Sequence, residues 1–429
     1  MNIAVIGTGY VGLVTGAVLA SFGNKVIALD VDKEKISLLK KGEVPFFEPG
    51  LKDLVLKGIE KNNLIFTSSY SEAIFKASII FICVGTPAKK NGDYDLSYVY
   101  SAAKSIGQNL KDYSVVCIKS TVPPSTSKKV EEIIKKVTVV PFDLASCPEF
   151  LKEGSAVKDS FSPSRVVIGT ETKKARDLLL KLHQPIKGPR VSCDLKSAQL
   201  IKYAANAFLA TKISFINSIA RLCDQIGADI DKVAEGLGLD PRIGQDFLKA
   251  GLGYGGSCFP KDTWALITYA KRLGYDFKFL KEVDNVNQNQ VAYFLEKAVR
   301  LLGGSIKGKT VSILGLSFKP NTDDVREARS LDLIRELKKM GAKIKVYDPE
   351  ALNTAKAVLK GVEFCSSSDK ALKGSSALLL VTEWEEFKKL NLKKIGKLMK
   401  DKVIIDGRNM FDKRQVKSLG FSYEGVGRK

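Results

Sequence analysis

The stretch Ile3-Ala-Val-Ile-Gly-Thr-Gly-Tyr-Val-Gly12 decides the fold at the start of this chain. The apolar run Ile3–Ile6 predicts a buried strand, and the glycine turn after it predicts a helix that continues to about Phe22. A second strand is predicted at Lys25–Leu29, and it ends in Asp30. Strand, glycine turn, helix and strand in this order are typical of a Rossmann-like, doubly wound α/β domain.

The turn has the spacing Gly-X-Gly-X-X-Gly of a dinucleotide site, with a strand before it and a helix after it. Gly7 allows the tight turn, Gly9 lets a pyrophosphate approach the backbone, and Gly12 lets the helix pack on the strand. Asp30 would accept hydrogen bonds from ribose hydroxyls and repel a 2′-phosphate, which favours NAD over NADP. The predicted cofactor contacts here are Gly7, Gly9, Tyr10, Val11, Gly12 and Asp30.

Strand and helix patterns continue to alternate after Asp30. Strands are predicted at Ile79–Val84 and Ser114–Ile118, and at Val137–Val140 leading to Ser146–Gly154. A parallel, doubly wound sheet binds its ligands at the carboxyl ends of its strands. The polar residues that follow these ends are Thr86, Thr121 and Glu149. Each could cap a helix or satisfy a turn, but their shared edge favours a common pocket.

A long helix is predicted from Asp194 to about Gly227, because this segment has helical periodicity without proline or interior glycine. Lys202 and Asn206 are four residues apart and therefore share a face. Their apolar neighbours, including Phe208, indicate polar groups set into a mostly buried helix, which is costly unless the groups are used. Further helices are predicted at about Ile230–Glu235, Pro260–Leu273 and Lys278–Leu302, followed by a linker at Gly303–Lys309.

The opening pattern returns after the linker, with predicted strands at Thr310–Leu314 and Lys343–Val346 around a helix at about Leu331–Met340. This turn lacks the three-glycine spacing and offers Lys319, which favours a nucleotide held by its phosphates over a second dinucleotide. Later strands are predicted at about Ala377–Val381 and Lys402–Asp406. The chain is thus predicted to be α/β, with two Rossmann-like doubly wound domains joined by a long central helix and a helical region. The predicted domains are 1–193, which binds NAD, 194–302, which is helical, and 303–429, which binds a nucleotide.

The segment Gly251-Leu-Gly-Tyr-Gly-Gly-Ser-Cys-Phe-Pro-Lys-Asp262 places Cys258 in a glycine-dense loop before a helix that is predicted to begin at Pro260. A helix N-terminus favours the thiolate form of a cysteine, and the glycines leave room for a bulky substrate. Taken alone, a buried structural cysteine is the more common interpretation of such a loop. The motifs elsewhere in the chain favour a nucleophile.

The composition limits the possible partners. The formal net charge is +21, but the lysines are mixed with acids along the whole chain and no nucleic-acid motif appears. The longest apolar runs are too short to span a membrane, and the first residues read as a strand without a basic leader. Seven scattered cysteines predict reduced thiols in the cytoplasm, with neither a disulfide framework nor a metal site.

Seven motifs together resemble the UDP-glucose/GDP-mannose dehydrogenase family of nucleotide-sugar 6-dehydrogenases, and they cover nearly the whole chain in the right order. They are Gly7–Gly12, Val84-Gly-Thr-Pro87, Ser120-Thr-Val-Pro123, Pro148-Glu-Phe-Leu151, Gly255-Gly-Ser-Cys-Phe-Pro-Lys-Asp262, Ser317-Phe-Lys-Pro320 and Asp406-Gly-Arg408. The phenylalanine after Cys258 favours UDP-glucose as the substrate.

The resemblance implies oxidation of the sugar C6 alcohol to a carboxylate with two NAD⁺ and one water. Cys258 would form a thiohemiacetal and then a thioester, and Lys202 with Asn206 would stabilise the oxyanion. Asp262 and Glu149 would assist hydrolysis, and Thr121 would hold the water or the nicotinamide. The only histidine, His183, lies away from every motif, so a Cys–His pair is not expected.

The resemblance also implies contacts and a partner. A homodimer is expected through the long helix. The implied NAD contacts are Lys35, Thr86, Thr121, Glu153 and Arg326. The implied substrate contacts are Glu149, Phe150, Leu151, Lys152, Lys202, Asn206, Tyr254, Gly255, Lys319 and Arg408, with Arg242 reaching a neighbouring subunit's substrate.

The sequence departs from the family pattern at Cys147, Ser164 and Arg329, where asparagine, aspartate and proline are common. None of these changes removes a catalytic group, but they leave the sugar preference open. The nearest alternative is a sibling enzyme for GDP-mannose or a UDP-N-acetylhexosamine. A two-electron dehydrogenase of small hydroxy acids would have no use for Cys258. A non-catalytic NAD-sensing protein would not need the complete set of Cys258, Lys202, Asn206, Asp262 and Glu149, so their presence argues against it.

Overall fold

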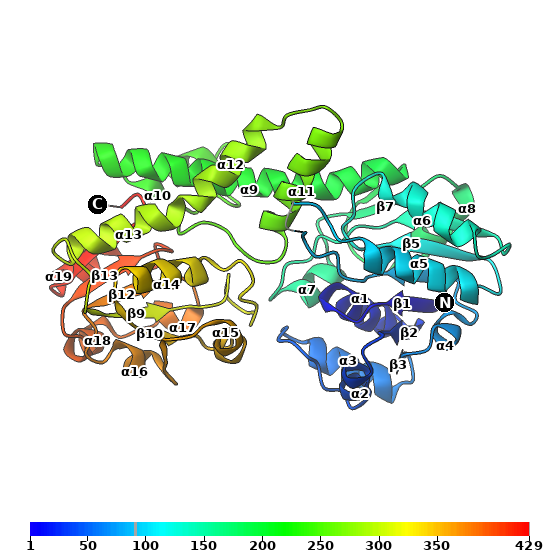
Figure 1. Cartoon of the computed structure of the whole chain (residues 1–429), viewed down its shortest axis with the longest axis horizontal. Coiled ribbons are helices and arrows are strands. Elements are labelled where there is room, and N and C mark those ends of the chain that lie inside the picture. Colours follow the sequence, from blue (N-terminus) through cyan, green and yellow to red (C-terminus); the bar gives the residue numbers. More distant parts are fainter. Residues whose placement is uncertain (90–91, 429) are drawn as a thin grey trace. The chain divides into compact units, whose positions relative to one another are not determined.

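The computed structural model describes residues 1–89 and 92–428, which divide into two units, Met1–Ala205 and Asn206–Lys429. The boundary falls inside α9 (Leu195–Ile226), the long green helix of Figure 1. This helix confirms the one predicted between Asp194 and Gly227. No helix in the described part of the chain is both long and apolar enough to cross a membrane.

Eight strands form one sheet among the described residues of the first unit, in the order β3-β2-β1-β4-β5-β6-β7-β8. Neighbouring strands are parallel except for β6 and β7. The order reverses at β1 and β4, so the ligand crevice of such a fold is expected at their carboxyl ends. The strands are β1 (Asn2–Ile6), β2 (Lys25–Leu29), β3 (Leu64–Thr67), β4 (Ile79–Ile82), β5 (Ser114–Ile118), β6 (Phe142–Ser146), β7 (Val166–Thr170) and β8 (Arg190–Cys193).

Helices cover both faces of this sheet, which explains why its central strands are continuous apolar runs. In β1, Ile3 and Val5 pack into the core on one face, while Ala4 and Ile6 pack into the core on the other. The first core contains α1 (Tyr10–Ser21), α2 (Lys33–Lys40), α3 (Leu51–Glu60), α7 (Ala156–Phe161) and α8 (Lys173–Leu182). The second contains α4 (Tyr70–Ile74), α5 (Ser97–Asn109) and α6 (Thr126–Lys135).

The strand predicted at Val137–Val140 is wrong. Helix α6 ends at Lys135, and Val139 in the connection after it is fully exposed at 101%. The strand is instead β6, Phe142–Ser146, which pairs with β5 from Ser114 to Ile118. Three valines in four residues resemble a strand, but the exposed valine shows that no sheet covers them.

The second unit has a parallel sheet of six strands among its described residues, in the order β11-β10-β9-β12-β13-β14. The strands are β9 (Thr310–Leu314), β10 (Lys343–Tyr347), β11 (Glu363–Phe364), β12 (Ala377–Leu380), β13 (Val403–Asp406) and β14 (Ser422–Gly425). The helices that alternate with these strands are α14 (Arg329–Lys339), α15 (Leu352–Val358), α16 (Ser368–Leu372), α17 (Glu385–Lys388), α18 (Leu392–Leu398) and α19 (Lys413–Ser418). This is the predicted second Rossmann-like domain.

Between α9 and this sheet the second unit is helical, as predicted, but with different bounds. The helices are α10 (Ile230–Gly238), α11 (Phe259–Arg272), α12 (Lys278–Gln288) and α13 (Gln290–Leu301). The single helix predicted over Lys278–Leu302 is therefore two helices that meet at Asn289, and no proline or glycine signals the break.

His183, at the end of α8, makes the stability of the first unit depend on pH. Burial, aided by the nearby charges of Lys119 and Arg190, lowers its pKa to about 4. Its Nδ1 lies 2.8 Å from the carbonyl oxygen of Leu179, to which the neutral ring donates. In the unfolded chain the pKa of histidine is about 6.5. The unfolded state therefore binds a proton that the folded state does not, and stability falls as the pH is lowered from about 6.5 to about 4.

We expect His183 to account for about 3 kcal/mol of this loss of unfolding free energy. Denaturant unfolding of the wild type and of His183→Gln at pH 7 and pH 4.5 measures it. The difference between the two pH values should shrink in the variant. An equal pH dependence in both proteins would show that His183 does not carry it.

Candidate active site

The turn between β1 and α1 leaves open space where a pyrophosphate would lie. Gly7 has φ +97°, and a Cβ there would lie 2.9 Å from the carbonyl oxygen of Cys83. A Cβ on Gly12 would lie 1.9 Å from the carbonyl oxygen of Gly7, so helix and turn require glycine at both positions. A Cβ on Gly9 would meet no atom within 4 Å, although Gly9 precedes the first residue of α1. The protein's own packing does not need this glycine, whereas a bound pyrophosphate does.

Asp30 follows β2 and is held as a carboxylate beside this turn. Its Oδ2 accepts hydrogen bonds from the backbone N–H and the hydroxyl of Thr8, each 2.9 Å long, and from the Lys35 ammonium at 3.1 Å. Burial alone would raise its pKa, but these bonds and one from the Asp32 N–H outweigh burial and lower the pKa. A fixed anion at this position fits the ribose hydroxyls of NAD. Lys35, which was expected to contact NAD, contacts Asp30 here.

The threonines predicted at strand ends lie together. The Thr86 hydroxyl donates a 3.0 Å hydrogen bond to the backbone oxygen of Thr121. The Ser120 hydroxyl donates to the backbone oxygen of Val84 at 2.6 Å, which joins the segments after β4 and β5 a second time. The structure thus confirms that Thr86 and Thr121 share one edge of the first sheet.

Glu149 and Lys202 form a buried ion pair in the first unit, with 2.8 Å between the carboxylate oxygen and the ammonium nitrogen. Glu149 is 7% exposed and Lys202 is 3% exposed. The other carboxylate oxygen accepts the backbone N–H of Leu151 at 2.6 Å. Burying two charges is costly unless the geometry is good and the remaining lone pairs are satisfied. Buried ion pairs are common at reactive sites, where the charged groups are kept in position and shielded from water.

The ring of Phe150 lies near two cations. The Arg165 guanidinium is 3.6 Å from the centre of its ring, and the Lys202 ammonium is 5.5 Å from it. Its neighbour Lys152 pairs with Asp159 at 3.7 Å. The Pro-Glu-Phe-Leu motif therefore places a carboxylate and an aromatic ring beside the cations of Arg165 and Lys202.

Cys258 is the residue at the N-terminal end of α11, which begins at Phe259 rather than at the predicted Pro260. Its backbone oxygen accepts the N–H of Asp262 at 2.8 Å, the first hydrogen bond of the helix. Its sulfur lies 3.6 Å from the Ser257 hydroxyl. All seven cysteines are free thiols, and only Cys258 and Cys193 are partly exposed. The helix dipole and exposed position are those that a cysteine nucleophile needs.

One turn into α11, Asp262 is 1% exposed and held from two sides. Asn206 Nδ2 donates to one carboxylate oxygen at 2.6 Å, and Lys261 Nζ donates to the other at 2.6 Å. Asn206 comes from α9, so the structure brings together two residues that the sequence placed 56 positions apart. Of the apolar neighbours expected to bury Lys202 and Asn206, Phe208 is 66% exposed, because it lies on the outer face of α9.

The remaining predicted contacts of the second unit with substrate or NAD are Tyr254, Gly255, Arg408, Lys319, Arg242 and Arg326. Arg408, after β13, donates to the backbone oxygens of Val381 at 2.6 Å and Gly253 at 3.2 Å, next to Tyr254 and Gly255. Lys319 lies 5.3 Å from the ring centre of Phe318. Arg242 and Arg326, the second of which was expected to contact NAD, have exposed side chains that each pair with the aspartate two residues before them. The backbone oxygen of Arg326 accepts the N–H of Gly256 at 3.0 Å, next to Gly255.

Sequence reasoning missed Glu48. Its carboxylate accepts from the Tyr10 hydroxyl and, at 2.6 Å, from the backbone N–H of Gly154, next to Glu153. Burial raises the pKa of Tyr10, and the Glu48 carboxylate raises this pKa further. The only signal in the sequence is the Glu-Pro-Gly turn at Glu48, which gives no hint of a contact more than a hundred residues away.

The fold and these sites define an NAD-dependent dehydrogenase that carries a second Rossmann-like domain. Three family models match consecutive parts of the chain: the NAD binding domain of the UDP-glucose/GDP-mannose dehydrogenase family at 1–187, its central domain at 196–289 and its UDP binding domain at 312–413. The chain belongs to the UDP-glucose/GDP-mannose dehydrogenase family.

Individual relatives agree over the full length. The chain is 50% identical to the UDP-glucose 6-dehydrogenase TuaD of Bacillus subtilis, covering all of this chain and 93% of that protein. It is 42% identical to the UDP-glucose 6-dehydrogenase of Rhizobium meliloti, with full coverage of both. The solved structure of a UDP-glucose dehydrogenase from Pyrobaculum islandicum matches with a TM-score of 0.93 and 37% identity, over 100% of this chain and 98% of that one.

Proposed function

We propose that this enzyme oxidises UDP-glucose at C6 to UDP-glucuronate through a covalent intermediate on Cys258. The observation that carries the proposal is the partly exposed thiol at the N-terminus of α11, with the buried Asp262 one turn behind it. The relatives named as UDP-glucose 6-dehydrogenases, at 42% to 50% identity, support the substrate.

The proposed chemistry removes four electrons in two stages. NAD⁺, when bound, accepts a hydride from C6. As the first hydride leaves, the hydroxyl proton passes to a bound water, or to Lys202 once this has given its own proton to Glu149, and an aldehyde results. The Cys258 thiolate adds to the aldehyde, and loss of a second hydride from this thiohemiacetal leaves a thioester. Water then releases the carboxylate and the thiol. One alcohol, two NAD⁺ and one water give one carboxylate, two NADH and three protons.

The polar residues have separate roles in this proposal. Lys202 and Asn206 stabilise the oxyanion of the tetrahedral species. Asp262 and Glu149 position the hydrolytic water and take its proton. Thr121 orients either this water or the nicotinamide ring of NAD. Their hydrogen-bonded pairing, Lys202 with Glu149 and Asn206 with Asp262, supports these roles because it fixes each side chain before substrate binds.

We propose three domains, 1–193, 194–302 and 303–429, and binding residues that come from all three. Lys35, Thr86, Glu153 and Arg326 are assigned to NAD. Phe150, Leu151, Lys152, Tyr254, Gly255, Lys319 and Arg408 are assigned to the nucleotide sugar, and Arg242 to the sugar of a neighbouring subunit. The free cysteines support a reducing, cytoplasmic compartment.

The substrate is tested with a panel of nucleotide sugars. NADH formation at 340 nm should be fastest with UDP-glucose, with kcat/KM at least about 100-fold above GDP-mannose and UDP-N-acetylmannosamine, the difference that about 3 kcal/mol of binding contacts provides. Faster turnover of either of the other sugars would assign the enzyme to that substrate instead. The similarity to UDP-D-ManNAc dehydrogenase of Pyrococcus horikoshii, at 29% identity and a TM-score of 0.89, is the reason to include the amino sugar.

We also propose a homodimer through α9. Three aromatic or apolar residues on the second-unit part of this helix repeat every seven positions and are more than half exposed: Phe208, Phe215 and Leu222. A seven-residue apolar stripe is the pattern by which one helix packs on a copy of itself. Light scattering should give a mass of about twice 46.9 kDa, and Phe215→Asp should halve it. A wild-type mass of one chain would contradict the dimer.

A further inference from the structure

The segment Gly251–Tyr254, which leads to Cys258, is held by buried amide side chains rather than by neighbouring strands. The Asn217 side-chain oxygen accepts the Gly251 N–H at 2.8 Å. The Gln290 side-chain nitrogen donates to the Gly251 carbonyl at 2.9 Å. Asn217 lies on α9 and Gln290 on α13, and both are 0% exposed. Two helices therefore satisfy both backbone groups of one glycine.

The same arrangement recurs three residues later. The side-chain oxygen of Asn287 accepts the N–H of Tyr254 at 2.8 Å, and its side-chain nitrogen donates to the Tyr254 carbonyl at 3.1 Å. Asn287 lies on α12 and is also 0% exposed. A single amide thus pairs with the backbone as a neighbouring strand would.

Two glycines of this segment allow close contacts, Gly253 with an amide side chain and Gly251 with the backbone after β13. Gly253 has φ +98°, and a Cβ there would lie 2.5 Å from the Asn287 side-chain oxygen. A Cβ on Gly251 would lie 2.7 Å from the backbone oxygen of Gly407. Any side chain at these two positions would displace the groups that hold the segment. The two glycines and the amides therefore act together to hold the segment in place.

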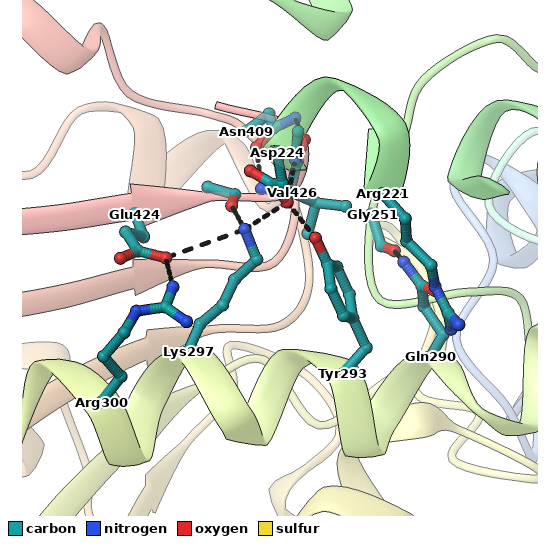
Figure 2. Close-up of polar contacts among 12 residues, drawn as sticks. Arg221, Asp224, Gly251, Gln290, Tyr293, Lys297, Arg300, Asn409, Glu424 and Val426 are labelled. Carbon is teal, nitrogen blue, oxygen red and sulfur yellow. Dashed lines mark hydrogen bonds and ion pairs between the residues drawn. The ribbon is translucent and has the colours of Figure 1, made fainter. Parts of the chain in front are cut away.

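A second row of polar contacts fixes the helices that carry two of the amides. Arg221 on α9 donates to the Gln290 side-chain oxygen at 2.9 Å and 3.3 Å, and Figure 2 shows both residues beside Gly251. One turn along the helices, Asp224 accepts hydrogen bonds from Tyr293 and from the buried ammonium of Lys297. These contacts fix the register of α9 against α13, and with it the position of Gln290.

The chain between Tyr254 and Cys258 has little freedom left. The N–H of Gly256 donates to the backbone oxygen of Arg326 at 3.0 Å, and Cys258 is already fixed as the first residue of the α11 hydrogen-bond pattern. The position of the sulfur is therefore linked to the amides through the three residues between Tyr254 and Cys258. We propose that Asn217, Asn287 and Gln290 are positioning residues that hold Cys258 in its reactive place, an inference that rests on the proposed role of Cys258.

The test is Asn287→Ala, with the exposed Asn285→Ala on the same helix as the matched control. We expect kcat with UDP-glucose to fall about 100-fold in Asn287→Ala with little change in KM, because a nucleophile displaced by about 1 Å costs that much. The pH at half-maximal alkylation of Cys258 by iodoacetamide, followed on its peptide by mass spectrometry, should rise as the thiol leaves the helix N-terminus. Asn287→Asp keeps the acceptor for the Tyr254 N–H and should recover part of kcat. Asn285→Ala should match the wild type in kcat and in the pH at half-maximal alkylation of Cys258.

Gln290→Glu is the second variant, because it keeps the size of the side chain and its contact with Arg221 but loses the donor to Gly251. It should lower kcat and move the alkylation profile in the same direction, and it covers the case in which Asn287→Ala does not fold. If Asn287→Ala and Gln290→Glu both fold and both keep the wild-type kcat and alkylation profile, the inference is overturned. Activity that survives in Cys258→Ser would instead overturn the proposed function, so the two failures are distinguishable.

Discussion

We expect replacement of Cys258 by serine to lower kcat for the oxidation of UDP-glucose by about 10⁴-fold or more, the loss that follows removal of a covalent nucleophile. A serine hydroxyl at the same position is not ionised near neutral pH, so it is a poor nucleophile toward the aldehyde without a neighbouring base. Folding should be little affected, because Cys258 is only partly buried and its sulfur has the Ser257 hydroxyl as its neighbour at 3.6 Å. Steady-state NADH formation and far-UV circular dichroism measure the two effects.

The matched control is Cys193→Ser, because Cys193 is the other partly exposed thiol. It ends β8 and lies on no motif of the family. This variant should keep the wild-type kcat. Equal activity of both serine variants would remove the thioester from the mechanism, while loss in both would point to general damage.

The second large effect concerns the buried pair of Lys202 and Glu149. Lys202→Met leaves the carboxylate buried and uncompensated, so we expect the free energy of unfolding to fall by about 3–5 kcal/mol. The turnover number should fall by about 10²–10³-fold as well, because the cation proposed to stabilise the oxyanion is lost. Denaturant unfolding and initial rates at saturating UDP-glucose and NAD⁺ measure these changes.

A second substitution separates stability from catalysis at this pair. In Lys202→Met/Glu149→Leu neither charge remains, so much of the lost stability should return while activity stays low. Lys173 and Asp177 form an exposed pair at 2.5 Å in the same unit, and Lys173→Met should cost no more than about 1 kcal/mol. If the double variant regained activity, Lys202 would be a structural residue only.

The first sheet could be predicted where its local signals were strong. The glycine turn after β1 and the aspartate after β2 have a fixed order that few other folds share. The strand predicted at Val137–Val140 was wrong because β-branched residues also occur in exposed connections. The actual strand, β6, was missed because it contains the polar Asp143. The break at Asn289 was missed because nothing in the sequence prevents a helix from continuing through it.

The members of the site were predictable, but their partners were not. The four-residue spacing of Lys202 and Asn206 predicted that both would lie on one face, and both are buried. Their partners, Glu149 and Asp262, are 53 and 56 positions away, and only the fold brings them close. The amides that hold Gly251–Tyr254 were passed over for the same reason, because a buried asparagine in a helix has no sequence signal of its own.

The most direct test of the central claim is the number of NADH molecules formed per UDP-glucose when the sugar is limiting and NAD⁺ is in excess. A covalent intermediate on Cys258 keeps the aldehyde bound between the two hydride transfers, so we predict two NADH per sugar, with UDP-glucuronate as the product. One NADH per sugar, or an aldehyde released into solution, would contradict the account.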